Sequence, residues 1–285
     1  MALEKSKNLA LEKKAHELRH LCLKTVSWAG SGHVGGSLSA MDIFTVLYHH
    51  HMNIDPSNPK WNKRDRFILS KGHCGIGYAP VLADLGYFDK ELLKEFNLTG
   101  SKLGMHLDST KVPGVDASTG SLGHGLPIGL GIALAARYLG ESYYTYCLLG
   151  DGECDEGVIW EAAMAISHYN TTNLITFVDR NHCMMDGKTE DIMKLEPFAD
   201  KWRAFGFKVL EINGNDIDEI DRAILEAKAT KDKPVVIIAN TIKGCGVHFM
   251  EDNYRWHYGG LDSEKLIEAQ QSLDSYFENR MKGAL

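Results

Sequence analysis

Five short apolar segments, separated by stretches with helical periodicity, constrain the fold of this chain most strongly. The apolar segments cover residues 66–70, 144–149, 174–178, 207–211 and 235–239. Their apolar residues are continuous rather than alternating, which is typical of strands that are covered on both faces of a parallel sheet. The helical stretches between them cover residues 72–85, 122–139, 157–169 and 217–229. This alternation predicts an α/β fold in which helices flank a parallel sheet.

The two ends of the chain predict further helices. Apolar residues recur at helical spacing from about residue 3 to Trp28, and Gly30 is placed to end that helix. After the last apolar segment, an irregular loop is expected over residues 243–260, followed by a C-terminal helix. The sequence has no internal repeat and no linker of biased composition, so we predict one domain over residues 1–285.

Charge and cysteine content exclude several classes of partner. The chain has 31 Lys and Arg against 38 Asp and Glu, for a net charge of −7, and it has no run of basic residues. Nucleic acid and anionic membrane surfaces bind clustered positive charge first, so neither is an expected partner. The longest uncharged stretch, residues 117–136, is rich in glycine and lacks the apolarity of a membrane span. The six cysteines show no C-x-x-C pair, and the N-terminus mixes charges, so we expect reduced thiols and a cytoplasmic location.

Polar, glycine-flanked segments follow four of the five predicted strands. In parallel sheets, ligands bind outside the carboxyl ends of the strands, so these segments are the first candidates for a site. They are Ser70-Lys71-Gly72-His73, Gly150-Asp151-Gly152-Glu153, Asp179-Arg180-Asn181 and Thr241-Ile242-Lys243-Gly244.

Asp151 and Asn181 are candidate magnesium ligands. Asp151 lies between two glycines that allow a bulky anion to approach the backbone, and Asn181 follows the next strand. A carboxylate and an amide oxygen, completed by phosphate oxygens and water, form the usual environment of Mg²⁺ in proteins. The alternative is that Asp151 caps the helix beginning near Glu156 and that Asn181 forms a turn.

Motifs along nearly the whole chain resemble one enzyme family. The segment GDGECDEGVIWEAA…NLITFVDRNHCMMDG resembles the thiamine-diphosphate motif, in which Asn follows GDG one strand later. Residues 31–40 (SGHVGGSLSA), 65–79 (DRFILSKGHCGIGYA), 116–131 (DASTGSLGHGLPIGLG) and 242–259 (IKGCGVHFMEDNYRWHYG) resemble segments of transketolase, in the same order. The resemblance covers only the N-terminal, diphosphate-binding half of transketolase, and it implies the thiamine-diphosphate-binding fold of that half.

The resemblance also implies roles for individual residues. Asp151, Asn181 and the backbone carbonyl of Cys183 correspond to ligands of Mg²⁺, for which Ca²⁺ or Mn²⁺ can substitute. Contacts with the diphosphate are implied for His73, Gly152, Lys243 and His257. Contacts with the thiamine and its aminopyrimidine are implied for Gly36, Gly120, Ser121 and Leu122. His33, His106 and His257 resemble catalytic histidines of the substrate channel, and Glu156 resembles the acid of a carboxylate network that crosses the subunit interface.

The implied reaction moves a two-carbon ketol group from a ketose to an aldose, both of which are sugars or sugar phosphates. Each step transfers a proton to or from an oxygen, and imidazole exchanges protons near neutral pH. In the family, the other half of the enzyme supplies the glutamate on the aminopyrimidine, the stacking aromatic residue and the arginines for sugar phosphate. None of the motifs of that half occurs here. We therefore predict one subunit of a split transketolase, completed by a separate C-terminal subunit in an α2β2 assembly.

Two alternatives stay open at this stage. The α subunit of a 2-oxoacid dehydrogenase also carries a GDG…N half and needs a partner, although the surroundings of His33, His73 and His257 favour transketolase. A non-catalytic paralogue that retains the fold as a regulatory or assembly subunit is the other alternative.

Three further patterns are weaker. The glycines of residues 123–129 imitate a dinucleotide fingerprint, but the strand that should precede them is absent. The acids of residues 151–156 imitate an EF-hand, but the sixth position is Glu156 rather than glycine. His16 and His20, and likewise the run of residues 49–51, have zinc-like spacing without a visible third ligand, so we interpret them as solvated or interior histidines.

Overall fold

A computed structural model describes residues 3–283 of the chain. Within these residues, one five-stranded sheet has the order β1-β2-β3-β5-β4, and all neighbouring strands are parallel. The strands are β1 (Arg66–Leu69), β2 (Thr145–Gly150), β3 (Leu174–Arg180), β4 (Lys208–Asn213) and β5 (Val235–Asn240). All five predicted strands are confirmed, with small differences at their ends, and so is the predicted α/β class.

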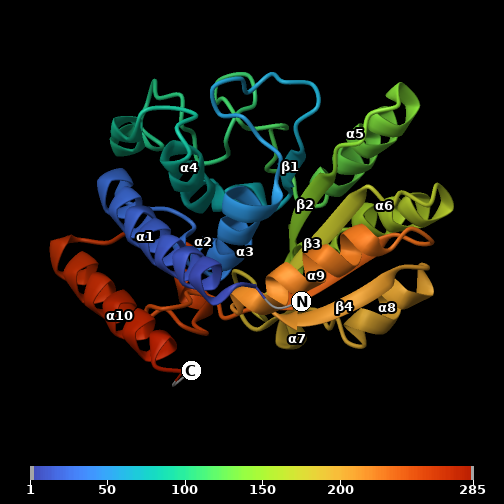
Figure 1. Ribbon diagram of the computed structural model, residues 1–285. Helices are drawn as coiled ribbons and strands as arrows, with labels where there is room; N and C mark the ends of the chain where they lie inside the picture. The colour runs from blue at the N-terminus through green and yellow to red at the C-terminus, as the bar shows by residue number, and fades with distance from the viewer. Residues whose placement is uncertain (1–2, 284–285) are drawn as a thin grey trace.

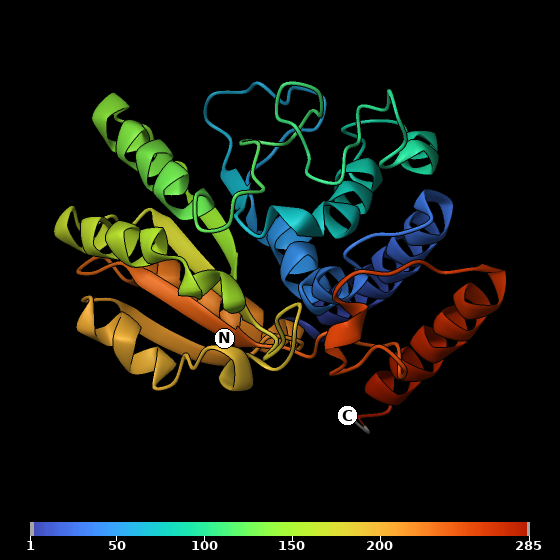
Figure 2. The same ribbon diagram turned by 180° about the vertical axis from the view of Figure 1, so that it is seen from behind.

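Helices cover both faces of the sheet, as Figures 1 and 2 show from opposite sides. One face carries α5 (Gly125–Leu139), α6 (Gly157–His168) and α8 (Phe198–Ala204). The other face carries α3 (Met41–Val46), α4 (Gly75–Asp84) and α9 (Ile217–Ala229). Helices α1 (Lys5–Ala29) and α2 (Val34–Ser39) pack against these helices. The remaining helices are α7 (Thr189–Ile192), α10 (Ser263–Met281), the π-helix η1 (Leu47–His51), and the 3₁₀ helices η2 (Gly72–Cys74), η3 (Lys90–Glu95), η4 (Gly152–Asp155) and η5 (Tyr254–His257).

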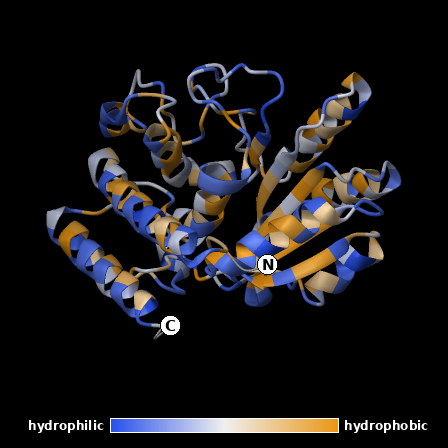
Figure 3. Cartoon of the chain, viewed as in Figure 1, coloured by the Kyte–Doolittle hydropathy of each residue, from blue (hydrophilic) through white to orange (hydrophobic). Residues whose placement is uncertain are grey.

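Successive strand residues point into two separate cores. Phe177 of β3 joins the core beneath α1, α3, α4 and α9, whereas its neighbour Val178 joins the core beneath α5, α6 and α8. This alternation follows from the two-residue period of a strand, and both faces are apolar because both are covered. In Figure 3, hydrophobic residues predominate along most of the sheet, whereas hydrophobic and hydrophilic residues alternate along α1 and α10.

Strand β4 departs from the prediction that the strands are buried on both faces. It pairs only with β5 and forms one edge of the sheet, so its residues are half-buried or exposed. Glu211 is exposed and bonds Arg203 at 2.8 Å. A charged edge of this kind opposes pairing with a strand of another molecule.

Buried ion pairs fix the N-terminal helices. Helix α1 ends at Ala29, so the prediction that Gly30 ends this helix is confirmed, and Gly30 forms a left-handed cap with a φ of +76°. Arg19 of α1 bonds both carboxylate oxygens of Asp42 on α3, at 2.7 and 2.8 Å. Arg280 of α10 bonds Glu12 of α1 at 2.8 Å. The first and last helices are therefore joined side by side (Figure 1).

The register of the sheet brings four strand ends to one edge. Gly150 of β2 lies opposite Asp179 of β3, and Arg180 of β3 lies opposite Asn240 of β5. The polar segments that follow β1, β2, β3 and β5 consequently start close together, as the sequence predicts. Among residues 3–283, no helix has the length and apolarity needed to cross a membrane.

Candidate cofactor site

A cavity of about 310 Å³ lies at the carboxyl edge of the sheet. Predicted site residues that line it are His33, Gly36, His73, Gly120, Leu122, Asp151, Gly152, Asn181, Cys183, Lys243 and His257. Its other lining residues are Lys71, Gly150, Glu153, Met184, Met185 and Asp186. Three predicted residues, His106, Ser121 and Glu156, do not line this cavity.

Asp151 lies at the end of β2 with its carboxylate buried. One carboxylate oxygen accepts the Gly152 N–H at 2.8 Å, and the other accepts the His182 N–H at 2.7 Å and an Arg180 N–H at 3.2 Å. Asp151 therefore caps the short helix η4, not the helix α6 that begins after Glu156. Burial raises the pKa of the Asp151 carboxyl, and the charge of Arg180 opposes that rise.

Asn181 and Cys183 place two more oxygens at the same edge. The side-chain amide of Asn181 donates to Asp179 at 3.0 Å, which fixes the direction of its Oδ1. That Oδ1 accepts the Cys183 N–H at 3.2 Å. Asn181 therefore also forms the turn that is the alternative prediction for this residue. The carbonyl of Cys183 accepts from the ammonium of Lys243 at 3.0 Å. A carboxylate, an amide oxygen and a peptide carbonyl thus gather beside a lysine ammonium.

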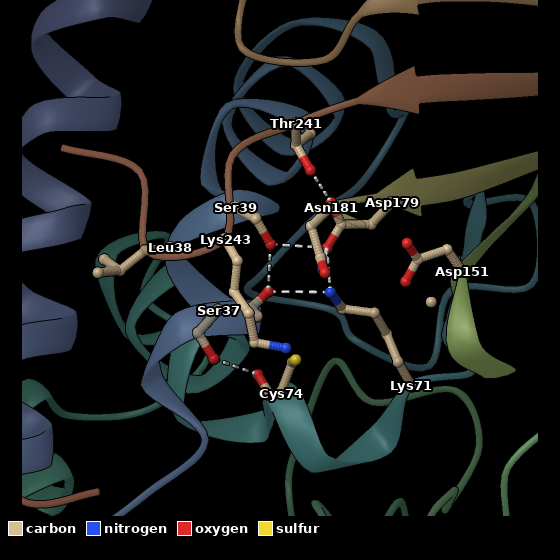
Figure 4. A network of polar contacts seen from close by, with 12 residues as sticks. Ser37, Leu38, Ser39, Lys71, Cys74, Asp151, Asp179, Asn181, Thr241 and Lys243 are labelled. Atoms are coloured by element: carbon tan, nitrogen blue, oxygen red, sulfur yellow. Dashed lines mark hydrogen bonds and ion pairs between the residues drawn. The ribbon is translucent and has the colours of Figure 1, made fainter. Parts of the chain in front are cut away.

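A network centred on Asp179 lies beneath the cavity (Figure 4). The Asp179 carboxylate, which is fully buried, pairs with Lys71 and accepts hydrogen bonds from Ser39 at 2.7 Å and from Thr241. Lys71 also donates to the carbonyl of Gly36 at 2.9 Å. Burial favours the neutral carboxyl, but the adjacent Lys71 ammonium holds the pKa of Asp179 below its usual value. Lys71 and Asp179 both follow predicted strands. Their position at the strand ends could therefore have indicated that they support the site.

Three histidine rings form one wall of the cavity. The ring centres of His33, His73 and His257 lie 5.0 to 5.3 Å apart. Nδ1 of His33 is buried, with no hydrogen-bond partner among the described residues. Burial lowers the pKa of His33 to about 4, aided by His106 and Lys243, and burial with Lys243 lowers the pKa of His257 to about 3. Both imidazoles are therefore neutral at physiological pH.

The three predicted residues outside the cavity lie around it. The ring of His106 has its centre 6.5 Å from that of His33, and it packs against Gly120. Ser121 and Glu156 are exposed, and the side chain of Glu156 does not cap α6. Glu153, three residues before Glu156, is buried instead. Its carboxylate accepts hydrogen bonds from Ser70, from the Gly123 N–H at 2.7 Å and from the Gly150 N–H at 2.9 Å. No role was predicted for Glu153 from the sequence, although it lies directly after the GDG motif.

The cavity fits a diphosphate group accompanied by Mg²⁺. The oxygen types of Asp151, Asn181 and the Cys183 carbonyl are those that Mg²⁺ accepts, and Lys243 adds a positive charge for an anion. At two positions that line the cavity, close packing favours glycine because a side chain would crowd a neighbouring residue. A Cβ on Gly36 would lie 3.0 Å from Cys74 Sγ, and one on Gly152 would lie 3.0 Å from Met184 Cγ.

Comparisons with known proteins identify the family. Residues 11–279 match the family described as "Transketolase, thiamine diphosphate binding domain". The chain is 40% identical to a subunit of the apulose-4-phosphate transketolase of Phocaeicola vulgatus, a match that covers 95% of this chain and 96% of the relative. It is 44% identical to the 6-deoxy-6-sulfo-D-fructose transketolase subunit SqwG of Clostridium sp. (strain MSTE9), over 93% and 96% of the two chains.

Solved transketolases share the fold over part of their length. The transketolase of Campylobacter jejuni superposes with a TM-score of 0.85 and 32% identity, covering 96% of this chain and 46% of that one. The transketolase of Leishmania mexicana gives a TM-score of 0.86 and 28% identity, covering 96% and 45%. The chain thus spans less than half of these solved enzymes but nearly all of its subunit-type relatives. It belongs to the transketolase family, in which it corresponds to the thiamine-diphosphate-binding domain.

Proposed function

We propose that this chain is the N-terminal subunit of a split transketolase, which uses thiamine diphosphate and Mg²⁺ to transfer a two-carbon ketol group between sugars. One observation carries the proposal. The chain aligns with 96% of two relatives that are named transketolase subunits, whereas it covers 45% of a solved single-chain transketolase. The cavity at the carboxyl edge of the sheet supports the cofactor assignment.

The proposed cofactor contacts divide into three groups. Asp151, Asn181 and the Cys183 carbonyl would hold Mg²⁺, with Ca²⁺ or Mn²⁺ as substitutes. The diphosphate would contact His73, Gly152, Lys243 and His257. The thiamine rings would contact Gly36, Gly120, Ser121 and Leu122. Glu156, exposed at the start of α6, is proposed to join a carboxylate network with a neighbouring subunit.

The proposed catalytic residues handle protons around the bound sugar. When bound, thiamine diphosphate supplies the carbanion chemistry that breaks and forms the C–C bond. His33 and His257 have pKa values of about 4 and about 3, so their neutral imidazoles accept hydrogen bonds from sugar hydroxyls or donate to carbonyl oxygens. His106, beside His33, is proposed to extend this set.

We propose that the substrates are sugars or sugar phosphates and that the partner is a separate C-terminal subunit. The relatives' names give apulose-4-phosphate and 6-deoxy-6-sulfo-D-fructose, two sugars that carry an anionic group. The partner would supply the glutamate that activates the cofactor, in an α2β2 assembly. A cytoplasmic location is proposed, and the free, buried thiols of all six cysteines support it.

The test is reconstitution with the natural partner. The tagged chain is purified from its source cells, and proteins that accompany it in stoichiometric amount are identified by mass spectrometry. Ketol transfer is then measured for the chain, the partner and their mixture, each with and without thiamine diphosphate and Mg²⁺. We expect turnover only in the complete mixture.

Three other outcomes would contradict the proposal. Full activity of the chain alone would disprove the split enzyme. Decarboxylation of a 2-oxoacid without ketol transfer would indicate the dehydrogenase subunit. A complex that does not bind thiamine diphosphate in the presence of Mg²⁺ would indicate the non-catalytic paralogue.

A further inference from the structure

Two histidines of the first helix and one aspartate of the last helix meet on the side of the molecule away from β4. Nε2 of His16 and Nε2 of His20, both on α1, lie 3.1 and 3.0 Å from the same carboxylate oxygen of Asp274 on α10. The two helices run side by side there (Figure 1). His20 and Asp274 are 254 residues apart in sequence, which is why the sequence alone shows no third ligand beside the histidine pair.

Packing holds these side chains in place. The ring of His16 stacks on Phe277 of α10, with 4.5 Å between ring centres and 17° between ring planes. The rings of His16 and His20 meet edge to face at 4.5 Å, as the spacing of one helical turn allows. One turn beyond Phe277, Arg280 is bonded to Glu12 of α1. The packing of the two helices therefore holds His16, His20 and Asp274 facing one another, in addition to the attraction between their side chains.

The arrangement has the chemistry and the dimensions of a metal site. Two imidazoles and one carboxylate form a common ligand set for Zn²⁺, and His at i and i+4 is a spacing that zinc sites use. With metal–ligand bonds of about 2.1 Å in a tetrahedral site, neighbouring ligand atoms lie roughly 3.4 Å apart. The observed separations of 3.0 and 3.1 Å are a few tenths of an ångström shorter, a difference that small side-chain rotations can supply. The three ligand atoms also lie within 4.8 Å of one another.

A second cluster, formed by His50, His51 and Asp221, provides a contrast. Its ligand atoms are equally close, but the Lys228 ammonium donates a hydrogen bond to the His51 carbonyl, which brings a fixed positive charge to the cluster. Asp221 has 2% of its side chain exposed and His51 has 6%, so solvent reaches this cluster only beside His50. In the first cluster, each histidine side chain is 20% exposed and Asp274 is 59% exposed, which leaves coordination positions open to solvent.

We propose that His16, His20 and Asp274 bind a divalent transition-metal ion, Zn²⁺, which fastens α10 to α1. This site is separate from the cofactor cavity. The ion links the two helices, and water fills its remaining coordination positions. Helix α10 also supports the loop of residues 243–260, since Ser272 donates to the Gly246 carbonyl and accepts from the His248 N–H. The ion thus stabilises the segment that carries Lys243 and His257 into the cavity.

The test measures Zn²⁺ binding to the full chain after chelator treatment, by titration calorimetry and thermal unfolding without thiamine diphosphate. We expect one Zn²⁺ per chain and a higher unfolding temperature with Zn²⁺. Asp274→Asn and His20→Gln should each weaken binding by at least about tenfold, because loss of an outer-shell partner alone costs that much. His50→Gln is the matched control in the second cluster and should bind Zn²⁺ like the unaltered chain.

Two further measurements locate the ion. Co²⁺ replaces Zn²⁺, and its visible absorption should change in Asp274→Asn but not in Asp151→Asn. Zn²⁺ binding lost in Asp151→Asn and kept in Asp274→Asn would place the ion in the cofactor cavity and overturn the proposal. Loss of binding in His50→Gln alone would place it in the second cluster, and absence of Zn²⁺ binding by the unaltered chain would also disprove the site.

Discussion

Lys71 and Asp179, 108 residues apart in sequence, form an ion pair with 2% and 0% of their side chains exposed. The pair joins the end of β1 to the end of β3 across β2, which lies between them in the sheet. The pair also forms hydrogen bonds with two residues that line the cofactor cavity: Lys71 donates to the Gly36 carbonyl, and Asp179 accepts from the Asn181 side chain.

Removal of one charge of this pair should strongly destabilise the chain. In Asp179→Asn, the Lys71 ammonium stays buried without its counter-charge, at an expected cost of about 3–5 kcal/mol in the free energy of unfolding. Urea denaturation measures this loss. The double variant Lys71→Met/Asp179→Leu removes both charges and should recover much of the stability. A single variant as stable as the unaltered chain would contradict the proposed contribution of the pair.

Glu153 and Glu156, three positions apart, should behave differently. Glu153→Gln weakens the bonds to the Gly123 and Gly150 amides and should cost about 1–3 kcal/mol of stability. Glu156→Gln should leave the stability of the isolated chain unchanged and weaken assembly, because Glu156 is exposed and proposed to face another subunit. Urea denaturation and sedimentation velocity separate the two effects. Equal stability losses in both variants would contradict the distinction.

Asp151→Asn should weaken Mg²⁺-dependent binding of thiamine diphosphate by at least about tenfold, because a charged metal ligand is replaced by a neutral one. Binding is measured by titration calorimetry on the complex with its partner. Asp155→Asn is the matched control, since Asp155 follows in the same segment, is exposed and does not line the cavity. Unchanged Mg²⁺-dependent binding in Asp151→Asn would refute the metal assignment.

His33→Gln should reduce turnover by about 10²–10⁴-fold, the usual contribution of a general acid or base. The affinity for thiamine diphosphate should stay unchanged, because His33 is proposed to act on the sugar. Steady-state kinetics of the reconstituted enzyme and a cofactor titration give the two values. A variant that loses the cofactor while retaining normal residual rates would show that His33 has another role.

Acid should destabilise the fold through His51. Burial, with Lys228 and His50, lowers the pKa of His51 from 6.5 to about 4, although the hydrogen bond that His51 donates to Asp221 raises it. Between these values the unfolded chain binds the proton and the folded chain does not, so stability falls as the pH decreases, by up to about 3 kcal/mol. His51→Gln should remove this part of the dependence in urea denaturation from neutral pH to about pH 4, whereas the part due to His33 and His257, whose pKa values are also lowered, remains. His168→Gln, an exposed control, should leave it unchanged.

Most of the fold follows from sequence patterns with a clear physical origin. The strands are continuous apolar segments because helices cover both faces, and α1 ends where Gly30 adopts its left-handed cap. The short helices α2 and α3 could not be predicted in this way. All of their residues are buried, so they lack the polar face whose spacing reveals a helix.

Only some residues of the candidate site could be predicted from the sequence. The residues at strand ends, such as Asp151 and Asn181, were found because a parallel sheet collects them at one edge. Glu153 was not assigned a role, because a buried acid and an exposed acid look alike in a sequence until the backbone amides around them are placed. Asp274 could not be matched to His16 and His20, because no local pattern connects the two ends of the chain.

The parallel sheet has a kinetic consequence. Parallel neighbours such as β1 and β2 are joined by long crossovers, so their pairing requires distant segments to meet, and we expect slow folding. The cavity takes residues from His33 to His257 and is complete only when these crossovers have closed. We expect the contacts around the cavity to form after the folding barrier, so that a molecule bound there slows unfolding without accelerating folding. Cofactor supply would then set how long a folded chain survives, not how quickly it forms.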